Sequence, residues 1–354
     1  MTRTTDTREQ FRPPGHPNEH FLLTTVVGSY PKPTWLGRAR EWLDDDAVDF
    51  DAADFAEATD DAARLVTEEH ERTGLDVVVD GEMRRTEMVE YFAERIDGYA
   101  FNGPVKVWGH NYFDKPSIVD AVAYDEPWLV DEYAFTASVA ERPVKVPITG
   151  PYTLARWSFN EHYDDTEAAA FALAELVNQE VAALVEAGAR YIQVDEPALA
   201  QREDDHQVVG ECLERIVAEV PDDVRLALHV CYGDYSRIYP ELLDFPVHEY
   251  DVELANGDFD QLDVFTEPAF TKDFAMGVVD VHDARVESVD EIAARIRKGF
   301  AVVPPERLTV SPDCGMKLLP RPVAAAKLTN MVAAARQVEA ELDAGEVEVA
   351  ATAD

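Results

Sequence analysis

The sequence predicts an α/β fold, a single (β/α)8 TIM barrel in which each strand of a parallel sheet is followed by a helix. Eight short runs rich in β-branched residues recur along the 354 residues, and stretches with helical periodicity separate them. Several of the runs are almost continuously apolar, as is typical of parallel strands buried on both faces. Apolar residues make up 46% of the chain, which is enough for one large core.

The predicted strands are, in chain order, TTVVGSY (24–30), DVVVDGE (76–82), VKVPITGP (144–151), YIQVDEPAL (191–199), RLALHVCYG (225–233), VHEYDVEL (247–254), FAMGVVDVH (274–282) and LTVSPDCGM (308–316). Between the third and fourth runs, TEAAAFALAELVNQEVAALVEAG has helical periodicity and stops at Gly188, a typical C-terminal helix cap. Its apolar face comprises Phe171, Leu173, Leu176, Val177, Val181, Leu184 and Val185. Ser288 and Glu291 have the spacing of a capping box and predict the start of a later helix.

Three further segments complete the predicted organisation. Residues 1–20 are polar and Pro-rich and are expected to form a flexible N-terminal arm before a barrel at 21–345. Residues 346–354 are expected to form an acidic C-terminal tail. Within the barrel, residues 97–143 are rich in aromatics and poor in helical pattern, so we interpret them as an insertion, with a hairpin as one candidate structure.

The charge of the chain restricts its partners. There are 71 acidic and 31 basic residues, a net charge of −40, and the acids are spread along the chain. Such a surface repels nucleic acids and anionic membranes, which we exclude as main partners. Because the apolar content is normal, adaptation to high salt (a halophilic protein) explains the charge better than disorder does.

The expected location is the cytoplasm. No apolar stretch approaches the roughly 18 residues that span a bilayer, and the N-terminus has no signal-peptide core. The chain has three cysteines, too few for a disulfide framework, and thiolate ligands require a reducing compartment.

A metal site is predicted from four residues near strand ends. His229 and Cys231 form an H-x-C pair, Glu253 closes the next run, and Cys314 ends the last one. Sulfur together with imidazole favours zinc over magnesium or calcium. With three permanent ligands and one displaceable carboxylate, zinc would accept a substrate thiol. The alternative is that the cysteines are small buried hydrophobes, an interpretation that we keep for Cys212 in GECLERIVAEV.

Other polar residues fall at or just past the predicted strand ends. In a (β/α)8 barrel, the C-terminal strand ends face the active site. The residues that share this placement with the metal set are Gly28, Ser29, Glu82, Asp195, Glu196 and His282. The sequence therefore predicts that they converge with the metal site on one mouth of the barrel.

Eight segments in order resemble the C-terminal catalytic barrel of cobalamin-independent methionine synthase: VVGSYPKP, DGEMRRTEMVEYF, ITGPYTLARWSF, IQVDEPAL, LHVCYGDY, DVELANGDF, VVDVHDARVES and SPDCGMK. The resemblance spans about residues 24–335. Enzymes of this family move a methyl group from 5-methyltetrahydrofolate to the zinc-bound thiolate of homocysteine. The resemblance implies that His229, Cys231, Glu253 and Cys314 bind zinc, which deprotonates the substrate thiol.

The resemblance also implies the acceptor contacts. The backbone amides of Gly28 and Ser29 would hold the carboxylate of homocysteine, and Glu82 and Asp195 would hold its ammonium group. The alternative for Glu82 is a solvated loop acid, and for Asp195 a helix N-cap before Glu196.

On the donor side, His282 matches the histidine that protonates the leaving folate nitrogen, which leaves poorly without a proton. Asp280 or Asp283 would orient its imidazole; the alternative is a structural histidine. Trp157 matches the aromatic position against which the pterin packs, with core packing as the alternative.

The donor side departs from the family pattern. Phe113-Asp114 stands where the family has an Arg-Cys pair next to the folate, and a folate-contacting Glu is replaced by Gln201, with Glu203 nearby. The family's N-terminal barrel has no counterpart here, so a second subunit that replaces it is a candidate partner. The alternatives to folate are a methylcorrinoid donor with the same acceptor, a non-catalytic zinc-binding partner subunit, and a metal-dependent hydrolase.

Overall fold

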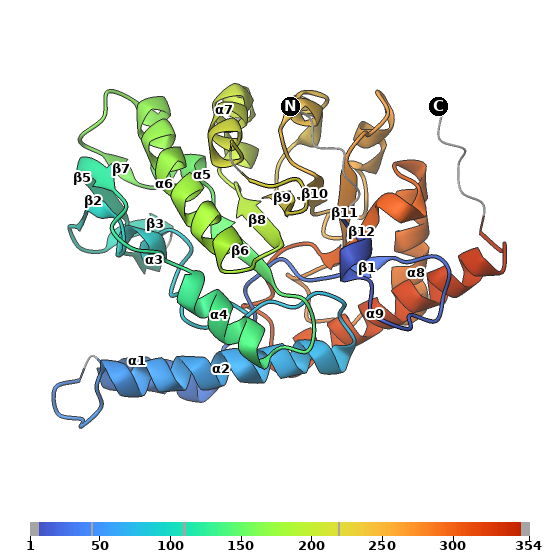
Figure 1. Cartoon of the computed structure of the whole chain (residues 1–354), viewed down its shortest axis with the longest axis horizontal. Coiled ribbons are helices and arrows are strands. Elements are labelled where there is room, and N and C mark those ends of the chain that lie inside the picture. Colours follow the sequence, from blue (N-terminus) through green and yellow to red (C-terminus); the bar gives the residue numbers. More distant parts are fainter. Residues whose placement is uncertain (1–6, 44, 109–110, 219, 348–354) are drawn as a thin grey trace. The chain divides into compact units, whose positions relative to one another are not determined.

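The computed structural model (Figure 1) describes residues 7–43, 45–108, 111–218 and 220–347, without the side chains of 106–113. Its main sheet has the strand order β1, β12, β11, β10, β9, β8, β6. These strands are β1 (Leu23–Thr24), β6 (Lys145–Thr149), β8 (Tyr191–Asp195), β9 (Arg225–Val230), β10 (Glu249–Val252), β11 (Asp273–Val279) and β12 (Leu308–Pro312). The pairs β1–β12, β11–β12 and β8–β9 are parallel.

One of the eight predicted runs, 76–82, does not form a regular strand. The N–H groups of Asp76 and Val77 donate to the carbonyl of Thr24, the last residue of β1. On its other side, Val78 forms a parallel bridge with Val144 next to β6. The run therefore lies between β1 and β6, the two ends of the seven-strand order, and the predicted fold class is confirmed.

Six of the other seven predicted strands are present close to their predicted positions, whereas the run 24–30 overlaps β1 only at Thr24. All seven runs extend past the strands at their C-terminal ends. The run 308–316, for example, is strand only over Leu308–Pro312. The apolar and β-branched positions form most of the strands. Of the predicted site residues, His229 and Asp195 lie at or near the last residue of their strands, whereas Cys231, Glu253 and Cys314 lie in the loops that follow. This is the placement on which the predicted site depends.

The chain folds into two compact units. The first comprises residues 85–131 and 147–250 and contains α3 (Glu90–Ala93), α5 (Pro151–Arg156), α6 (Thr166–Glu186) and α7 (His206–Ile216). Within it, α6 packs against α5 and α7. Five of the seven predicted apolar-face residues of α6 are buried, and the helix ends just before Gly188, whose φ is +108°.

The helix α6 is also the one described helix that is long and apolar enough, by length and composition, to cross a membrane. This differs from the expectation of no such stretch, because its many alanines count as apolar. Half of the residues in the most apolar 18-residue stretch of this helix are buried inside the protein. Buried core helices pass the same test, so this is weak evidence for a membrane span.

The predicted insertion lies largely in the first unit. It contains β2 (Asp97–Phe101), β3 (Val105–Trp108), β4 (Asn111–Phe113) and β5 (Pro116–Ala123). The strands β3 and β4 form an antiparallel pair, and β5 pairs with β2 and with β7 (Phe159–Asn160). The segment also holds a helix that the sequence did not predict, α4 (Val130–Val139). Its Val, Tyr, Phe and Thr residues have modest helix propensity, so local pattern gave little indication of it.

The second unit comprises residues 7–84, 132–146 and 251–347. Its helices are α1 (Thr34–Leu43), α2 (Ala52–Thr73), α8 (Val289–Lys298) and α9 (Arg321–Asp343). The predicted capping box of Ser288 and Glu291 is present at the start of α8. In Figure 1, α2 and α9 run along the same side of this unit, and the two helices are in contact.

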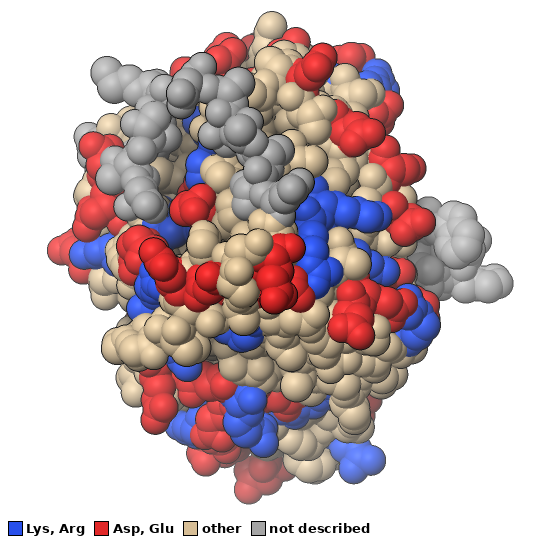
Figure 2. Space-filling model, turned by 90° about the vertical axis from the view of Figure 1, so that its right-hand side faces the viewer, with Lys and Arg blue, Asp and Glu red and all other residues tan. Residues whose placement is uncertain are grey.

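The predicted division into arm, barrel and tail stays a prediction, but part of the arm is ordered by contacts. The Arg8 guanidinium is buried and donates to the Phe21 carbonyl at 3.0 Å, and His16 lies 2.9 Å from Glu339 of α9. Of the predicted tail, residues 348–354 lie outside the described residues. Figure 2 shows acidic side chains distributed over the visible face between basic and uncharged ones, as the even spread in the sequence indicates.

Candidate metal and acceptor site

The H-x-C pair lies at the C-terminal end of β9. His229 is in the strand and Cys231 follows it directly, and both side chains are buried. Side chains two residues apart in an extended chain point to the same face, so imidazole and thiol can face one point. Four of the six residues of RLALHV are apolar and all six are buried, as is typical of a parallel strand covered on both faces.

The structure brings three of the four predicted ligands together. The ligand atoms of His229, Cys231 and Cys314 all lie within 4.8 Å of one another. Sulfur atoms bound to one tetrahedral zinc at about 2.3 Å stand about 3.8 Å apart, so this spacing fits a zinc ion. Two soft sulfurs and one imidazole also suit zinc chemically. Glu253 is buried just after β10 but is not part of the group found among the described residues.

A buried acid joins the segments that carry Glu253 and Cys314. The carboxylate of Asp313 accepts N–H groups from Leu254 (3.0 Å), Ala255 (2.8 Å) and Asn256 (2.7 Å). Burial raises its pKa to about 7, the three N–H groups act against this rise, and the charge of Glu253 adds to it. Asp313 was not predicted as a site residue, because in the sequence only its position next to Cys314 distinguishes it from other acids.

The predicted acceptor residues Gly28, Ser29 and Glu82 belong to segments that the structure joins. The Met316 N–H donates to the Ser29 carbonyl at 2.7 Å, which ties this segment to the loop of Cys314. Gly315 lies so close that an added Cβ would overlap the Ser29 hydroxyl. Glu82 is half-buried with φ +57°, and its N–H donates to Asp80 Oδ1 at 2.9 Å. It is therefore more constrained than a solvated loop acid.

Asp195 is the last residue of β8, buried, and in register with His229 on β9. Its Oδ1 accepts a hydrogen bond from Gln193 Nε2 at 2.7 Å. The alternative of a helix N-cap does not hold, because the short 3-10 helix that follows has Ala198 as its N-cap. Asp195 thus stands at the same strand-end level as the first predicted ligand.

Glu196 is a functional candidate whose only signal in the sequence is its position just past a predicted strand end. Its carboxylate is fully buried and accepts the N–H groups of Tyr152 (3.0 Å) and Thr153 (2.7 Å) and the Thr153 hydroxyl (2.6 Å). It thereby satisfies the N-terminal donors of α5, whose N-cap, Gly150, has no side chain. Burial raises its pKa to about 7, against the effect of these hydrogen bonds. The helix that it anchors ends at Arg156, and Trp157 is its C-terminal cap residue.

His282 follows β11 and is exposed. Asp280 Oδ1 accepts its backbone N–H at 2.8 Å and lies 3.8 Å from its Nδ1, whereas Asp283 accepts from Arg285. Of the two predicted orienting acids, Asp280 is therefore the one beside the imidazole. Its segment is anchored by a buried pair: Lys327 Nζ donates to the Asp280 carbonyl (2.9 Å) and to Glu287 (2.6 Å).

The predicted donor contacts are less constrained. Trp157 is half-buried at the C-terminal cap of α5. The side chain of Phe113 lies outside the described residues, and Asp114 and Gln201 are exposed. Glu203 is buried and paired with Arg237 at 3.0 Å.

Cys212 agrees with its predicted role as a small buried hydrophobe. It lies in α7, fully buried, and burial raises the pKa of its thiol. It is not part of the group that contains His229 and Cys231.

Comparison with known proteins gives one consistent result. A family model described as "Cobalamin-independent synthase, Catalytic domain" matches residues 22–337. A methionine synthase of Saccharolobus solfataricus is 44% identical over 323 residues, 91% of this chain and 96% of that protein. A methionine synthase of Pyrococcus abyssi is 44% identical over 324 residues, with 91% and 94% covered. A B12-independent methionine synthase from Shewanella sp. W3-18-1, solved in complex with selenomethionine, has a TM-score of 0.82 at 26% identity and covers 91% of this chain and 99% of its own.

Proposed function

The chain belongs to the cobalamin-independent synthase family, and on that premise we propose that it makes methionine by transferring a methyl group from 5-methyltetrahydrofolate to the zinc-bound thiolate of homocysteine. The observation that carries the proposal is the close approach of His229, Cys231 and Cys314. An isolated buried cysteine is usually a small hydrophobe, as Cys212 is, but two cysteines and a histidine within 4.8 Å form a donor set for a soft cation.

The zinc half of the proposal concerns the acceptor thiol. Bound zinc would hold the thiol as a thiolate near neutral pH, where a free thiol with a pKa of about 8.5 is mostly protonated. His229, Cys231 and Cys314 would be its permanent ligands, and Glu253 the carboxylate that the substrate sulfur replaces. Because two of these ligands are thiolates, we place the protein in a reducing compartment, the cytoplasm.

The acceptor's amino-acid end would be held by this chain's own groups. The amides of Gly28 and Ser29 would bind its carboxylate, and Glu82 and Asp195 its ammonium group, which gives each charge an opposite partner. The Shewanella protein was solved with selenomethionine, the selenium analogue of the proposed product. Its likeness over 91% of this chain supports an amino-acid pocket here.

The donor half rests on His282 and Trp157. When a methyl group leaves the folate nitrogen, that nitrogen must gain a proton, and His282, next to Asp280, would supply it. Trp157 would offer a flat surface to the pterin. A methylcorrinoid donor would need neither residue, since its leaving group is the reduced cobalt centre. A second subunit that completes the folate site belongs to the same proposal.

One assay separates the donors. Purified protein is incubated with homocysteine and either methyltetrahydrofolate or methylcobalamin, and methionine is measured. With folate, His282→Asn should slow transfer by roughly 10²- to 10⁴-fold and leave any cobalamin reaction nearly unchanged. His162→Asn is a matched control, because His162 lies 3.9 Å from Asp120, much as His282 lies 3.8 Å from Asp280. Methionine formed from methylcobalamin but never from methylfolate would overturn the donor and leave the zinc-thiolate half intact.

A further inference from the structure

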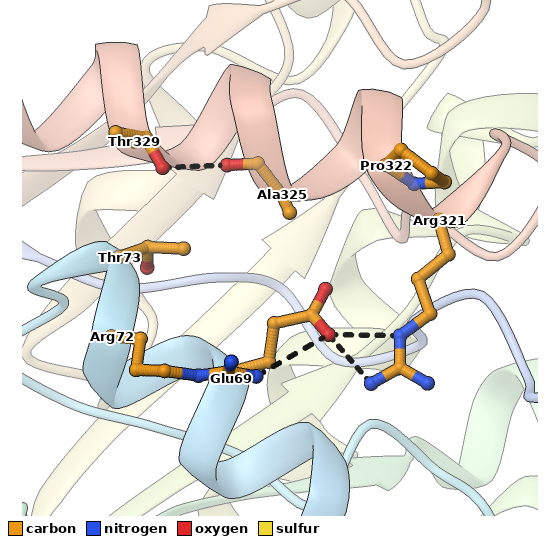
Figure 3. Close-up of a pocket in the computed structure, with 7 residues that line it drawn as sticks. All are labelled: Glu69, Arg72, Thr73, Arg321, Pro322, Ala325 and Thr329. Carbon is orange, nitrogen blue, oxygen red and sulfur yellow. Dashed lines mark hydrogen bonds and ion pairs between the residues drawn. The ribbon is translucent and has the colours of Figure 1, made fainter.

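A shared carboxylate links the outer helices of the second unit to its interior. Glu69 lies on α2 and Arg321 is the first residue of α9. Arg321 donates to Glu69 Oε2 through Nε (2.8 Å) and Nη2 (2.5 Å), while Arg72 stands 4.0 Å away. Figure 3 shows this pair among the residues that line a cavity. The cavity has a volume of about 420 Å³, and its other lining residues are Arg72, Thr73, Pro322, Ala325 and Thr329.

The second oxygen of Glu69 is bound from the inside. Glu69 Oε1 accepts a hydrogen bond of 2.7 Å from the hydroxyl of Tyr30, whose side chain is only 1% exposed. The ring of Tyr30 packs edge-on against buried His70, with 4.8 Å between centroids. Burial raises the pKa of Tyr30 well above its ordinary value, so the phenol remains a donor. Glu69 therefore bridges Arg321 at the surface and Tyr30 in the core.

The backbone around Tyr30 connects the three segments proposed to bind the acceptor. Its own N–H donates to the Gly81 carbonyl at 3.1 Å, immediately before Glu82. The preceding carbonyl, that of Ser29, accepts the Met316 N–H at 2.7 Å, two residues after Cys314. Tyr30 thus contacts the segment of Glu82 directly and borders the contact between Ser29 and the Cys314 loop.

The segment of Glu82 needs such support because its backbone is unfavourable. Glu82 has φ +57° and Gly81 has φ +70°, a region that residues with a Cβ rarely adopt. A Cβ at Gly81 would stand 2.7 Å from Val66 Cγ1 and 3.1 Å from Tyr30 Cβ, so the turn is pressed against this core. Conformations of this kind persist where the surroundings hold them.

We propose that Tyr30, Glu69 and Arg321 are positioning residues that hold the Ser29 and Glu82 segments in the geometry that binds the amino-acid end of the acceptor. The proposal rests on the proposed function, because it takes that acceptor to be homocysteine. In this proposal the three residues act from behind the two segments. Their effect passes through the hydroxyl of Tyr30 and the backbone on either side of it.

The test compares Tyr30→Phe, Glu69→Gln and Arg321→Gln with the unchanged protein in direct homocysteine titrations of the zinc-loaded chain. We call the hydrogen-bonded chain Tyr30–Glu69–Arg321 the relay. Loss of one hydrogen bond in it should weaken homocysteine binding by about 3- to 10-fold. Zinc content and the KM for the methyl donor should not change, a split that general destabilisation would not produce. Because Tyr30 and Arg321 act through the same carboxylate, their double variant should lose less than the product of the single losses.

The chain offers a matched control. Arg297 and Glu341 form a similar two-bond pair between α8 and α9 (2.8 and 2.6 Å), with comparable exposure but far from these loops in the chain. Arg297→Gln should leave homocysteine binding within about twofold. If the unchanged protein binds homocysteine and the three variants bind it equally well, the relay is refuted while the proposed function stands. If the unchanged protein binds no homocysteine at all, the proposed function itself fails.

Discussion

Replacing Gly150 with alanine should unfold the N-terminal end of α5, because Glu196 occupies the space that a Cβ would take. An added Cβ there would overlap the fully buried Glu196 carboxylate, which would have to shift away from the start of the helix. That carboxylate holds the N–H groups of Tyr152 and Thr153 and the Thr153 hydroxyl. Hydrogen bonds to a charged group contribute about 1.5–3 kcal/mol each, so the loss of two would cost about 3–6 kcal/mol.

The measurement is the free energy of unfolding from urea denaturation at pH 8, where the Glu196 carboxyl is mostly ionised. Gly37→Ala is the matched control: Gly37 lies in α1 with nothing within 4 Å of an added Cβ. That change should stabilise the protein slightly, by up to about 1 kcal/mol, as alanine does in a helix. A loss of less than about 1 kcal/mol in Gly150→Ala would show that Glu196 can move freely and that its hydrogen bonds do not anchor α5.

Three further predictions concern the site. Cys231→Ser and Cys314→Ser should each release zinc, measured by metal analysis, while the fold survives because the barrel has its own core; full zinc content in both variants would defeat the ligand assignment. Glu82→Gln and Asp195→Asn should each weaken homocysteine binding by about 1.5–3 kcal/mol, roughly 10- to 150-fold in Kd, at unchanged zinc content; normal binding in both would leave these acids a structural role only. For Glu196, the folded pKa of about 7 lies above its ordinary 4.5, so the folded protein keeps a proton that the unfolded chain releases. The contribution of this proton to the free energy of unfolding is fully present below pH 4.5. It is lost as the pH rises through 7, which lowers the free energy of unfolding by about 3 kcal/mol. Glu196→Gln should flatten the dependence of unfolding free energy on pH between 5 and 7, and an unchanged slope would contradict the raised pKa.

Strand positions were predictable from the sequence because burial on both faces leaves a continuous apolar run. The strands β6, β8, β9, β10 and β12 each lie wholly within a predicted run, and β11 lies within one except for its first residue. The segment 76–82 was predicted as a regular strand, but only its hydrogen bonds to Thr24 and its bridge to Val144 define its place. The helix α4 was missed because its residues have modest helix propensity and no strong cap signal.

The sequence by itself predicted the fold class, because apolar runs are a local property. Its motifs and its family resemblance led to His229, Cys231, Glu253 and Cys314 as predicted metal ligands, of which the structure groups the two cysteines and the histidine. Only the tertiary structure decided which acids support them. Asp313 and Glu196 look like ordinary acids in the sequence, yet burial and several hydrogen bonds distinguish them in the fold. Glu69 and Arg321 stand 252 positions apart, and no local pattern relates them. Contacts between residues so far apart in the sequence form only when the chain folds. In a barrel, neighbouring strands and helices can come from distant parts of the chain, and the local sequence of one does not indicate which other segment it will contact.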